Sequence, residues 1–302
     1  MKNKPVSKQP LISVLMPVHN AGSFLREAVE SIRSQTHTNW ELIAIDDGST
    51  DDTHSTLRQL AKHDERIVIL TNKKKTGIGY SLNKGLKQAN GAYIARMDAD
   101  DVSHPHRFVQ QLRLLNKHPE IIACGGQVEM IDGKGNVFAY KKFPTESDSL
   151  YSMIMQMVPL QHPVLLARAS VMKKYKYRED LSTAEDVDML FYLLQHGKLS
   201  NVNSFIYQYR KSDMSNGYHN VKKTFFITFG SRVEAIVKYG YKPTFVGLMV
   251  SAIQFALVSV LPSKMVVRMF ESLRFDPPQW RAFLWNRLSF SFSAILAPIT
   301  LR

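Results

Sequence analysis

A regular alternation of strand-like and helix-like segments over the first 120 residues limits this chain to a small set of folds. Short apolar runs alternate with segments whose apolar residues recur at helical spacing. The strand-like runs cover residues 11–16, 40–45, 67–70 and 93–97, and helix-like segments begin near residues 23, 53, 78 and 105. This alternation is typical of a mostly parallel sheet with helices on both faces. We therefore expect an α/β fold.

Turn-forming and polar residues follow three of the four strand-like runs, in the segments 17–20, 46–52 and 98–101. Ligands of such sheets bind outside the carboxyl ends of the strands, so this convergence indicates a binding site. The three carboxylates of residues 98–101 repel one another, and a hard divalent cation would relieve that repulsion. The alternative is a solvated acidic turn before the next helix. The chain has no G-x-G-x-x-G after the first strand and no Walker loop, which disfavours a dinucleotide cofactor and a P-loop ATPase.

Charge and cysteine content narrow the partners and the compartment. The net charge is +13; residues 221–302 hold 11 Lys+Arg and 3 Asp+Glu, so the tail carries +8 of it. An anionic partner is therefore expected near the tail. The single cysteine, Cys124, excludes an internal disulfide, and its apolar neighbours indicate a buried structural thiol. Residues 1–10 are basic and lack the apolar segment of a signal peptide, so we expect a reducing, cytoplasmic setting.

The pattern changes beyond residue 120. Residues 132–135 predict a hairpin turn, residues 147–158 predict a helix, and residues 205–207 predict a strand. Glu185 and Asp186 come just before apolar residues at helical spacing. Taken alone, this acidic pair has two explanations: a helix N-terminus that the helix dipole stabilises, or an acid/base site.

Six motifs match a known family in order and spacing. They are Pro17-Val18-His19-Asn20, Asp46-Asp47-Gly48-Ser49-Thr50-Asp51, Asn83-Lys84-Gly85, Gly91-Ala92-Tyr93-Ile94, Asp98-Ala99-Asp100-Asp101 and Glu185-Asp186. With them, residues 11–215 resemble the family-2 glycosyltransferases of the GT-A (Rossmann-like) fold, of bacterial surface-polysaccharide type. The resemblance implies an inverting, hexosyltransferase-type enzyme that uses a nucleoside-diphosphate sugar and Mg²⁺ or Mn²⁺.

The resemblance also implies roles for individual residues. The implied nucleotide-sugar contacts are Pro17, Val18, Asn20, Asp47, Asp98, His162 and Arg210. For His162 and Arg210, a structural role in a loop remains an alternative. The implied metal ligands are Asp98, Asp100 and Asp101, and the implied general base is Asp186, with Glu185 beside it. Ser212 stands where the family often has a histidine, which weakens the expectation of a metal ligand near the end of that region.

Two separate acidic sites also make chemical sense for such a transfer. Displacement of a nucleoside diphosphate builds negative charge on the leaving phosphate while the sugar gains oxocarbenium character. A cation held by carboxylates neutralises the leaving group. On the opposite face, a carboxylate accepts the proton of the attacking hydroxyl, which is otherwise a poor nucleophile.

The tail contains an uncharged segment, residues 243–263, that is long enough to be a transmembrane candidate. However, its small and polar residues recur at helical spacing, and a single span would export a basic flank against the positive-inside rule. We therefore expect a helix lying in the plane of an anionic membrane, with Trp280 and Trp285 at interfacial depth. A buried helix of a small C-terminal bundle is the alternative.

These expectations combine into one domain plan. Residues 1–10 form a basic segment, residues 11–220 the GT-A domain, and residues 221–302 a basic, apolar helical extension that associates with the membrane. The expected acceptor is a lipid-linked glycan, and the expected location is the cytoplasmic face of the membrane. A sugar nucleotidyltransferase is the main alternative, although residues 17–20 lack its Gly-rich basic loop. A non-enzymatic protein that binds anionic ligands is a second one; nucleic acid is not expected because the basic excess adjoins an apolar tail.

Overall fold

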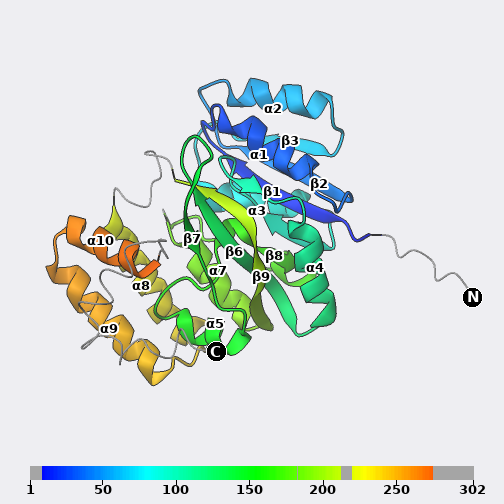
Figure 1. The fold of residues 1–302 in the computed structure, drawn as a ribbon. Coiled ribbons are helices and arrows are strands. Elements are labelled where there is room, and N and C mark those ends of the chain that lie inside the picture. Colours follow the sequence, from blue (N-terminus) through cyan, green and yellow to red (C-terminus); the bar gives the residue numbers. More distant parts are fainter. Residues whose placement is uncertain (1–8, 182, 212–219, 275–302) are drawn as a thin grey trace, which may run out of the picture.

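The computed structural model describes residues 9–181, 183–211 and 220–274, and a nine-stranded sheet forms its centre (Figure 1). The strand order is β3-β2-β1-β4-β8-β6-β9-β5, with β7 paired to β6. The first four strands are mutually parallel: β1 (Ile12–Val18), β2 (Trp40–Asp46), β3 (Ile67–Thr71) and β4 (Tyr93–Arg96). Because β1 lies between β2 and β4, the carboxyl ends of all three strands lie at one edge of the sheet.

The other half of the sheet is mixed. β8 (Leu166–Arg168) is antiparallel to both β4 and β6 (Ile121–Ile131), whereas β9 (Lys198–Arg210) is parallel to β6. The short β5 (Val102–Ser103) pairs with β9, and β7 (Val137–Lys141) forms the predicted hairpin with β6. Gly135 in that turn has φ +86°, a left-handed conformation that glycine adopts without strain.

Helices cover both faces of the sheet, as predicted. Side chains of β1 alternate between the faces: Val14 and Met16 pack on one side and Leu15 on the other. The helices of the first face are α1 (Phe24–Arg33), α2 (Thr53–Lys62) and α4 (Arg107–Lys117). Those of the second face are α3 (Ile78–Gln88), α5 (Ser147–Met153), α6 (Ala169–Met172) and α7 (Glu185–Leu194), with the short 3₁₀ turn η1 (His162–Val164) nearby.

Helix α5 is shorter than the sequence pattern predicts. It ends at Met153 instead of reaching residue 158, and the Gln156 N–H donates to the Met153 carbonyl, three residues back. Pro159 has no N–H and disfavours the helical conformation of the residue before it, so the pattern ends in turns. Cys124 is buried, as expected.

Three helices of the C-terminal region lie on the side away from α2 and β3 (Figure 1). They are α8 (Val221–Lys238), α9 (Phe245–Val260) and α10 (Ser263–Arg274). The first of them packs against the second face of the sheet, and the other two pack on it and on each other. Phe225, Val258 and Val266 form a small apolar cluster between them. In the described residues, no helix combines the length and apolar character needed to cross a membrane. Trp280 and Trp285 lie outside the described residues.

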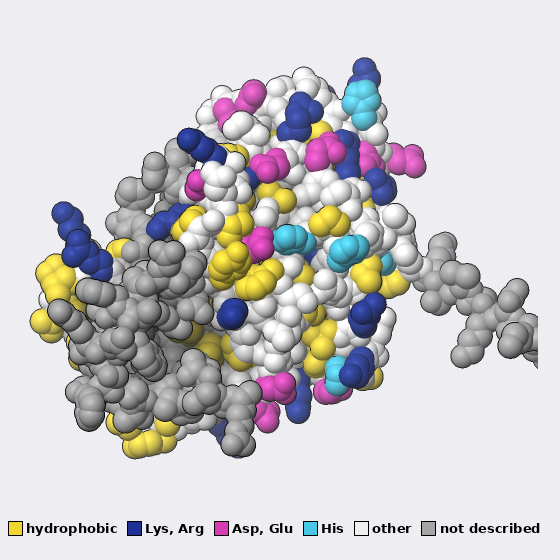
Figure 2. Space-filling model, in the orientation of Figure 1, with side chains coloured by type: hydrophobic (Ala, Val, Ile, Leu, Met, Phe, Trp, Pro, Cys, Tyr) yellow, Lys and Arg dark blue, Asp and Glu magenta, His cyan; other side chains and the backbone are white. Residues whose placement is uncertain are grey.

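Helix α9 buries the face that carries small and polar residues and exposes much of its apolar surface. The Ser251 hydroxyl donates to the Met155 carbonyl, and the Gln254 amide donates to the Gln156 carbonyl at 3.1 Å. The apolar face is left outside: Phe245 is 76% and Val260 82% exposed. Figure 2 shows hydrophobic side chains at the left and lower margins, where α9 and α10 lie. As the alternative expected, α9 belongs to a small C-terminal bundle with α8 and α10, but only one of its faces is buried there.

Candidate active site

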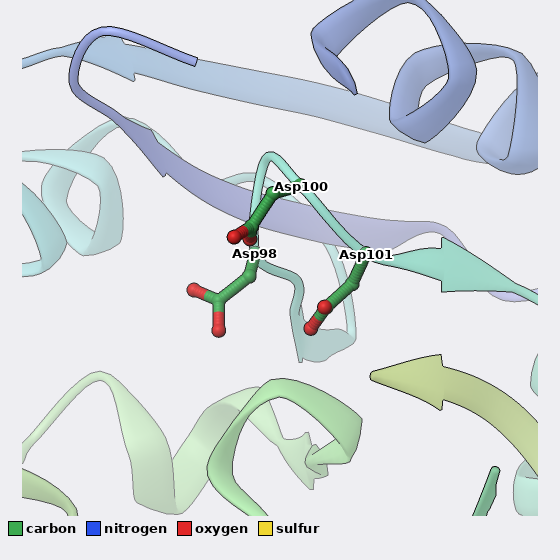
Figure 3. Close-up of side chains that lie close together, drawn as sticks. All are labelled: Asp98, Asp100 and Asp101. Atoms are coloured by element: carbon green, nitrogen blue, oxygen red, sulfur yellow. The ribbon is translucent and has the colours of Figure 1, made fainter. Parts of the chain in front are cut away.

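The three carboxylates predicted to bind metal lie together in the turn that follows β4 (Figure 3). Asp98, Asp100 and Asp101 each place a carboxylate oxygen within 4.8 Å of the others. β4 ends where the Met97 N–H donates to the Leu15 carbonyl, and the Asp98 N–H then donates to the Tyr207 hydroxyl on β9. The turn thus leaves the parallel half of the sheet and is fastened to the mixed half.

The environment of this acidic turn disfavours negative charge. Burial, and next the Asp98 carboxylate, raises the pKa of Asp100 to about 6. Burial and the two neighbouring carboxylates also raise the pKa of Asp101 well above its usual value. A divalent cation would reverse this penalty, because carboxylate oxygens at about 2.1 Å are the ligands that Mg²⁺ and Mn²⁺ prefer. Oxygens on one such ion are at most about 4.2 Å apart, so small side-chain rotations fit this set to a cation.

Arg210, at the end of β9, clamps the acidic turn. Its backbone N–H donates to Asp101 Oδ1 at 2.8 Å, and its Nε donates to the Asp100 carbonyl at 2.7 Å. Its remaining nitrogens donate to the Asp132 carbonyl and to the Glu27 carboxylate, at 3.1 and 2.6 Å. The side chain is 2% exposed. The guanidinium is therefore committed to the protein, and the geometry favours the structural role over the donor contact that the resemblance implies.

Arg96 is a buried cation beneath the acidic turn that the sequence reasoning missed. It ends β4 and forms an ion pair with Asp98 at 2.5 Å. Burial alone would lower the pKa of Arg96, but the Asp98 charge outweighs burial and raises it. The signal was present in the sequence, since Arg96 stands directly before the acidic run in a segment that otherwise reads as a buried strand. Arg96 supplies one fixed positive charge against three carboxylates.

The N-terminus of α7 carries the second acidic site. Ala184, which precedes it, has the left-handed φ of +64°, a conformation that costs a non-glycine residue energy and often marks a functional site. Glu185 is buried, and burial followed by the Asp186 charge raises its pKa to about 7. Asp186 is only half-buried, and its carboxylate accepts the Val187 N–H at 2.9 Å. Asp186 also lines a cavity of about 330 Å³.

His162 lies next to Glu185 and is fixed by Tyr177. Its Nε2 is 2.9 Å from the Tyr177 hydroxyl, and its Nδ1 is 3.9 Å from Glu185 Oε1. Burial, and next the Arg96 charge, lowers the pKa of His162 well below its usual value, so the imidazole is neutral. The Asn83 side chain in turn makes two hydrogen bonds to the Tyr177 backbone, at 2.8 and 2.9 Å. Tyr177 lies in none of the motifs that the sequence analysis identified.

The residues predicted to face the nucleoside lie at the ends of β1 and β2. Asp47 is 5% exposed and accepts four hydrogen bonds, from the Asn72 amide, the Thr76 N–H and hydroxyl, and the Gly77 N–H. Burial opposes ionisation, but these hydrogen bonds outweigh it and lower the pKa of Asp47. Gly48 permits the arrangement, because a Cβ there would lie 2.5 Å from the Lys74 carbonyl carbon.

Asn20, just after β1, connects the end of that strand to the turn that follows β2. It has a left-handed φ of +51°, and its side-chain oxygen accepts the Thr50 N–H at 2.8 Å. Pro17 and Val18 are the last residues of β1, paired with Ile45 and Asp46 of β2. The structure therefore brings Pro17, Val18, Asn20 and Asp47 to the edge at which the acidic turn begins, one strand away. Their contacts with a nucleoside, and the roles of all the other residues that the resemblance singles out, stay predictions.

A mostly parallel sheet with an acidic turn at its carboxyl edge is the arrangement expected of a GT-A glycosyltransferase, and comparison with known proteins confirms this class. The model of the family described as Glycosyl transferase family 2 matches residues 13–181, more than half of the sequence, and the chain belongs to this family. An uncharacterized glycosyltransferase of Haemophilus influenzae is 33% identical over 214 residues, which cover 67% of this chain and 65% of that protein. The putative glycosyltransferase EpsE of Bacillus subtilis is 34% identical over 207 residues, 67% of this chain and 73% of that protein.

Solved structures confirm the fold. S. aureus TarS in complex with UDP-GlcNAc superposes with a TM-score of 0.61 at 20% identity, over 74% of this chain and 66% of that chain. The mannosyltransferase PcManGT of Pyrobaculum calidifontis, in complex with GDP-Man and Mn²⁺, gives a TM-score of 0.54 at 14% identity, over 94% of this chain and 89% of that chain. At these identities the likeness establishes the fold alone.

Proposed function

We propose that this glycosyltransferase moves a hexose from a nucleoside-diphosphate sugar to a hydroxyl acceptor, with inversion at the sugar. The observation that carries the proposal is the acidic turn of Asp98, Asp100 and Asp101, held at the edge of the sheet where β1 and β2 also end. Family membership supports the sugar transfer. TarS with UDP-GlcNAc and PcManGT with GDP-Man share the fold, which supports a nucleoside-diphosphate sugar as the donor.

Mg²⁺ or Mn²⁺ is the proposed cofactor, and Asp98, Asp100 and Asp101 would hold it. When bound, the cation neutralises charge on the diphosphate leaving group. The chain's own contribution is to keep the three carboxylates in place, through the ion pair of Arg96 with Asp98 and through the hydrogen bonds of Arg210 to the turn. The presence of Mn²⁺ in the PcManGT complex supports this choice of cation.

Asp186 is the proposed general base. Inversion requires the acceptor hydroxyl to attack from the face opposite the leaving group, and a carboxylate there must accept its proton. Asp186 lines a cavity, whereas Glu185 is buried against His162. With a pKa near 7, Glu185 is partly protonated at neutral pH, which makes it the weaker candidate for the base. Glu185 and the neutral His162 instead pack together in the interior and hold the first turn of α7 in place.

A donor-binding screen tests this function directly. UDP-, GDP- and dTDP-sugars are titrated into the full chain with and without Mn²⁺, and into Asp100→Asn. We expect one class of nucleotide sugar to bind only in the presence of Mn²⁺, and the substitution to remove that dependence. If no nucleotide sugar binds, the proposed reaction is wrong. If one binds equally well without Mn²⁺ and to Asp100→Asn, the metal assignment is wrong.

We also propose that the enzyme works at the cytoplasmic face of the cell membrane, on a lipid-linked glycan of a surface polysaccharide. The exposed apolar face of α9 and the basic excess of the tail support this placement, because such a helix binds anionic lipid surfaces in the membrane plane. The test is co-sedimentation with vesicles of phosphatidylcholine and phosphatidylglycerol. Val260→Glu should reduce binding about tenfold or more, while Phe138→Glu, an exposed apolar position on β7, should not. Equal binding by both variants would contradict the placement.

A further inference from the structure

A cavity of about 330 Å³ separates the N-terminus of α7 from the C-terminal helices α8 and α10. Thr183, Ala184, Asp186 and Val187 form its wall at the proposed base. The opposite wall comes from α8 and α10 and includes Phe225, Arg232, Val267 and Phe270. This cavity, which we call the tail chamber, therefore exists only because the C-terminal helices pack against the glycosyltransferase domain.

The tail chamber combines two kinds of surface. Four of the described residues that line it are cationic and one is acidic: Lys141, Lys142, Lys211 and Arg232, against Asp186. The cations stand at the ends of β7 and β9 and on the inner side of α8, where Arg232 is 3% exposed. The apolar wall of Phe225 and Phe270 belongs to the same cluster that holds α8, α9 and α10 together.

We propose that the tail chamber binds the phosphate-bearing end of a lipid-linked acceptor. The phosphate group lies against the cations, among them Lys142 and Arg232, and the first part of the hydrocarbon chain lies along the apolar wall of α8 and α10. This inference rests on the proposed function, because it identifies the acceptor of the base Asp186 as an alkyl or isoprenyl phosphate carrying the sugar.

Charge and size support an amphiphilic ligand over a neutral sugar. A buried arginine with nearby lysines attracts a phosphate far more strongly than a hydroxyl group, since the low dielectric of the cavity enhances the attraction between charges. A volume of about 330 Å³ is near the lower limit of drug-sized ligand sites. It holds a head group and the beginning of a chain but not a whole lipid, so the rest of the chain must leave the chamber.

The exposed apolar face of α9 can contact the part of the hydrocarbon chain that leaves the chamber. α9 packs against α8 and α10, whose side chains form the apolar wall, and its own outer face is exposed and apolar. A lipid seated in the chamber therefore remains close to the surface that we propose to face the membrane. The glycosyl acceptor would reach Asp186 without leaving the bilayer surface.

Binding of dodecyl phosphate to the full chain, below its micelle concentration, is the test. Inorganic phosphate and dodecyl glucoside serve as comparison probes. We expect dodecyl phosphate to bind at least about tenfold more tightly than either. Lys142→Glu changes an exposed side chain at the chamber and should weaken binding by about tenfold; Arg232→Gln provides a second variant. Lys223→Glu is the matched control, an exposed lysine of α8 outside the lining, and should bind normally.

Three results would overturn the inference. They are equal binding of dodecyl glucoside, equal binding of inorganic phosphate, and dodecyl phosphate binding that neither chamber variant changes. The first would show apolar attachment alone, and the second a phosphate site that needs no lipid. Nucleotide-sugar binding with Mn²⁺ is measured on the same samples. If the donor binds and the chamber variants have no effect, only the chamber assignment fails; if no donor binds, the proposed function fails as well.

Discussion

Two acidic groups, which we call the first and second rims, lie at the carboxyl edge of the sheet, and their carboxylates have opposite pKa shifts. At the first rim, the end of β2, Asp47 accepts four hydrogen bonds from residues 72–77, and its pKa is lowered. At the second rim, residues 98–101, Asp101 is buried and Asp100 is partly buried beside Asp98, and the pKa values of Asp100 and Asp101 are raised. One strand, β1, separates the two.

The fold therefore stabilises one carboxylate and destabilises the others. Hydrogen bonds satisfy the Asp47 carboxylate at the first rim, so its negative charge stabilises the fold. The second rim keeps repulsive charge that the ion pair of Arg96 with Asp98 and the nearby Arg210 offset only in part. This repulsion is costly in the free protein and is relieved once a cation binds. Functional sites commonly retain such locally unfavourable arrangements. The same substitution, Asp to Asn, should therefore have opposite consequences at the two rims.

The largest effect is expected at the second rim. Asp100→Asn removes one ligand of the proposed cation and should lower kcat about a thousandfold with saturating Mn²⁺. Without metal, the variant should be at least as stable as the wild type, because repulsion with Asp98 is relieved. Thermal unfolding with and without Mn²⁺ measures both. The wild type should gain about 2.7 kcal/mol at a metal concentration of a hundred times Kd, and the variant much less.

Asp148→Asn is the control for this comparison, since Asp148 is an exposed acid on the first turn of α5. Its activity and its stabilisation by Mn²⁺ should match the wild type. A metal-free Asp100→Asn protein that is clearly less stable than the wild type would contradict the difference between the rims, even if its activity is lost.

Asp186→Asn should lower kcat by about a hundredfold to ten-thousandfold, the usual contribution of a general base, and leave donor affinity unchanged. Asp188→Asn is the informative comparison on the same helix. Asp188 is buried and accepts hydrogen bonds from Tyr175, Lys238 and Tyr239, so its loss should lower stability first. Steady-state kinetics with thermal unfolding separates the two. Reduced donor affinity in Asp186→Asn would indicate a role at the donor instead.

Arg210→Met tests whether the second rim depends on its clamp. The substitution removes charged hydrogen bonds to two carbonyl groups and one carboxylate, and should cost about 3 kcal/mol of folding free energy. Mn²⁺ affinity should fall about tenfold to a hundredfold, the usual effect of losing a group that orients metal ligands. Glu27→Gln loses only the half-exposed end of the clamp, so it should cost less than about 1 kcal/mol. Unchanged Mn²⁺ affinity in Arg210→Met would assign the clamp to stability alone.

The sequence predicted the parallel half of the fold well, because the spacing of apolar residues within each segment is enough to identify it as a strand or a helix. It also located the acidic turn, since Asp98, Asp100 and Asp101 are neighbours in the chain and meet by local geometry alone. The mixed half was less predictable. β9 pairs with β6 and β5 through contacts distant in sequence, and only residues 205–207 of its thirteen showed a strand pattern.

Tyr177 was missed for the same reason, and for Arg210 the sequence left a donor contact and a structural role open as alternatives. Arg210 reaches the acidic turn across about a hundred residues of chain, and Tyr177 reaches His162 only because Asn83 of α3 holds its backbone. Periodicity detects amphipathic faces but not their direction, so it could not show that α9 buries Ser251 and exposes Phe245. Contacts between distant segments decide these features.

The effect expected at the first rim is no larger than that of Arg210→Met, and its sign tests whether the two rims differ. Asp47→Asn should cost about 1–3 kcal/mol at pH 7, because an amide cannot accept from donors on both sides of the group. The pKa of Asp47 is lower in the folded protein than in the unfolded chain. Its contribution is therefore fully present above the unfolded value of about 4, and is lost as pH falls through the folded value.

Urea unfolding of the wild type and Asp47→Asn between pH 7 and pH 3 measures this contribution. The two free energies of unfolding should differ at pH 7 and approach each other in acid, since protonation removes from the wild type what the substitution removes at every pH. A constant difference would mean that the substitution disturbs packing around Gly48 instead of an ionised carboxylate. A difference that widens in acid would mean that the pKa of Asp47 is raised in the folded protein, as it is for Asp100 and Asp101. The two rims would then have pKa shifts in the same direction.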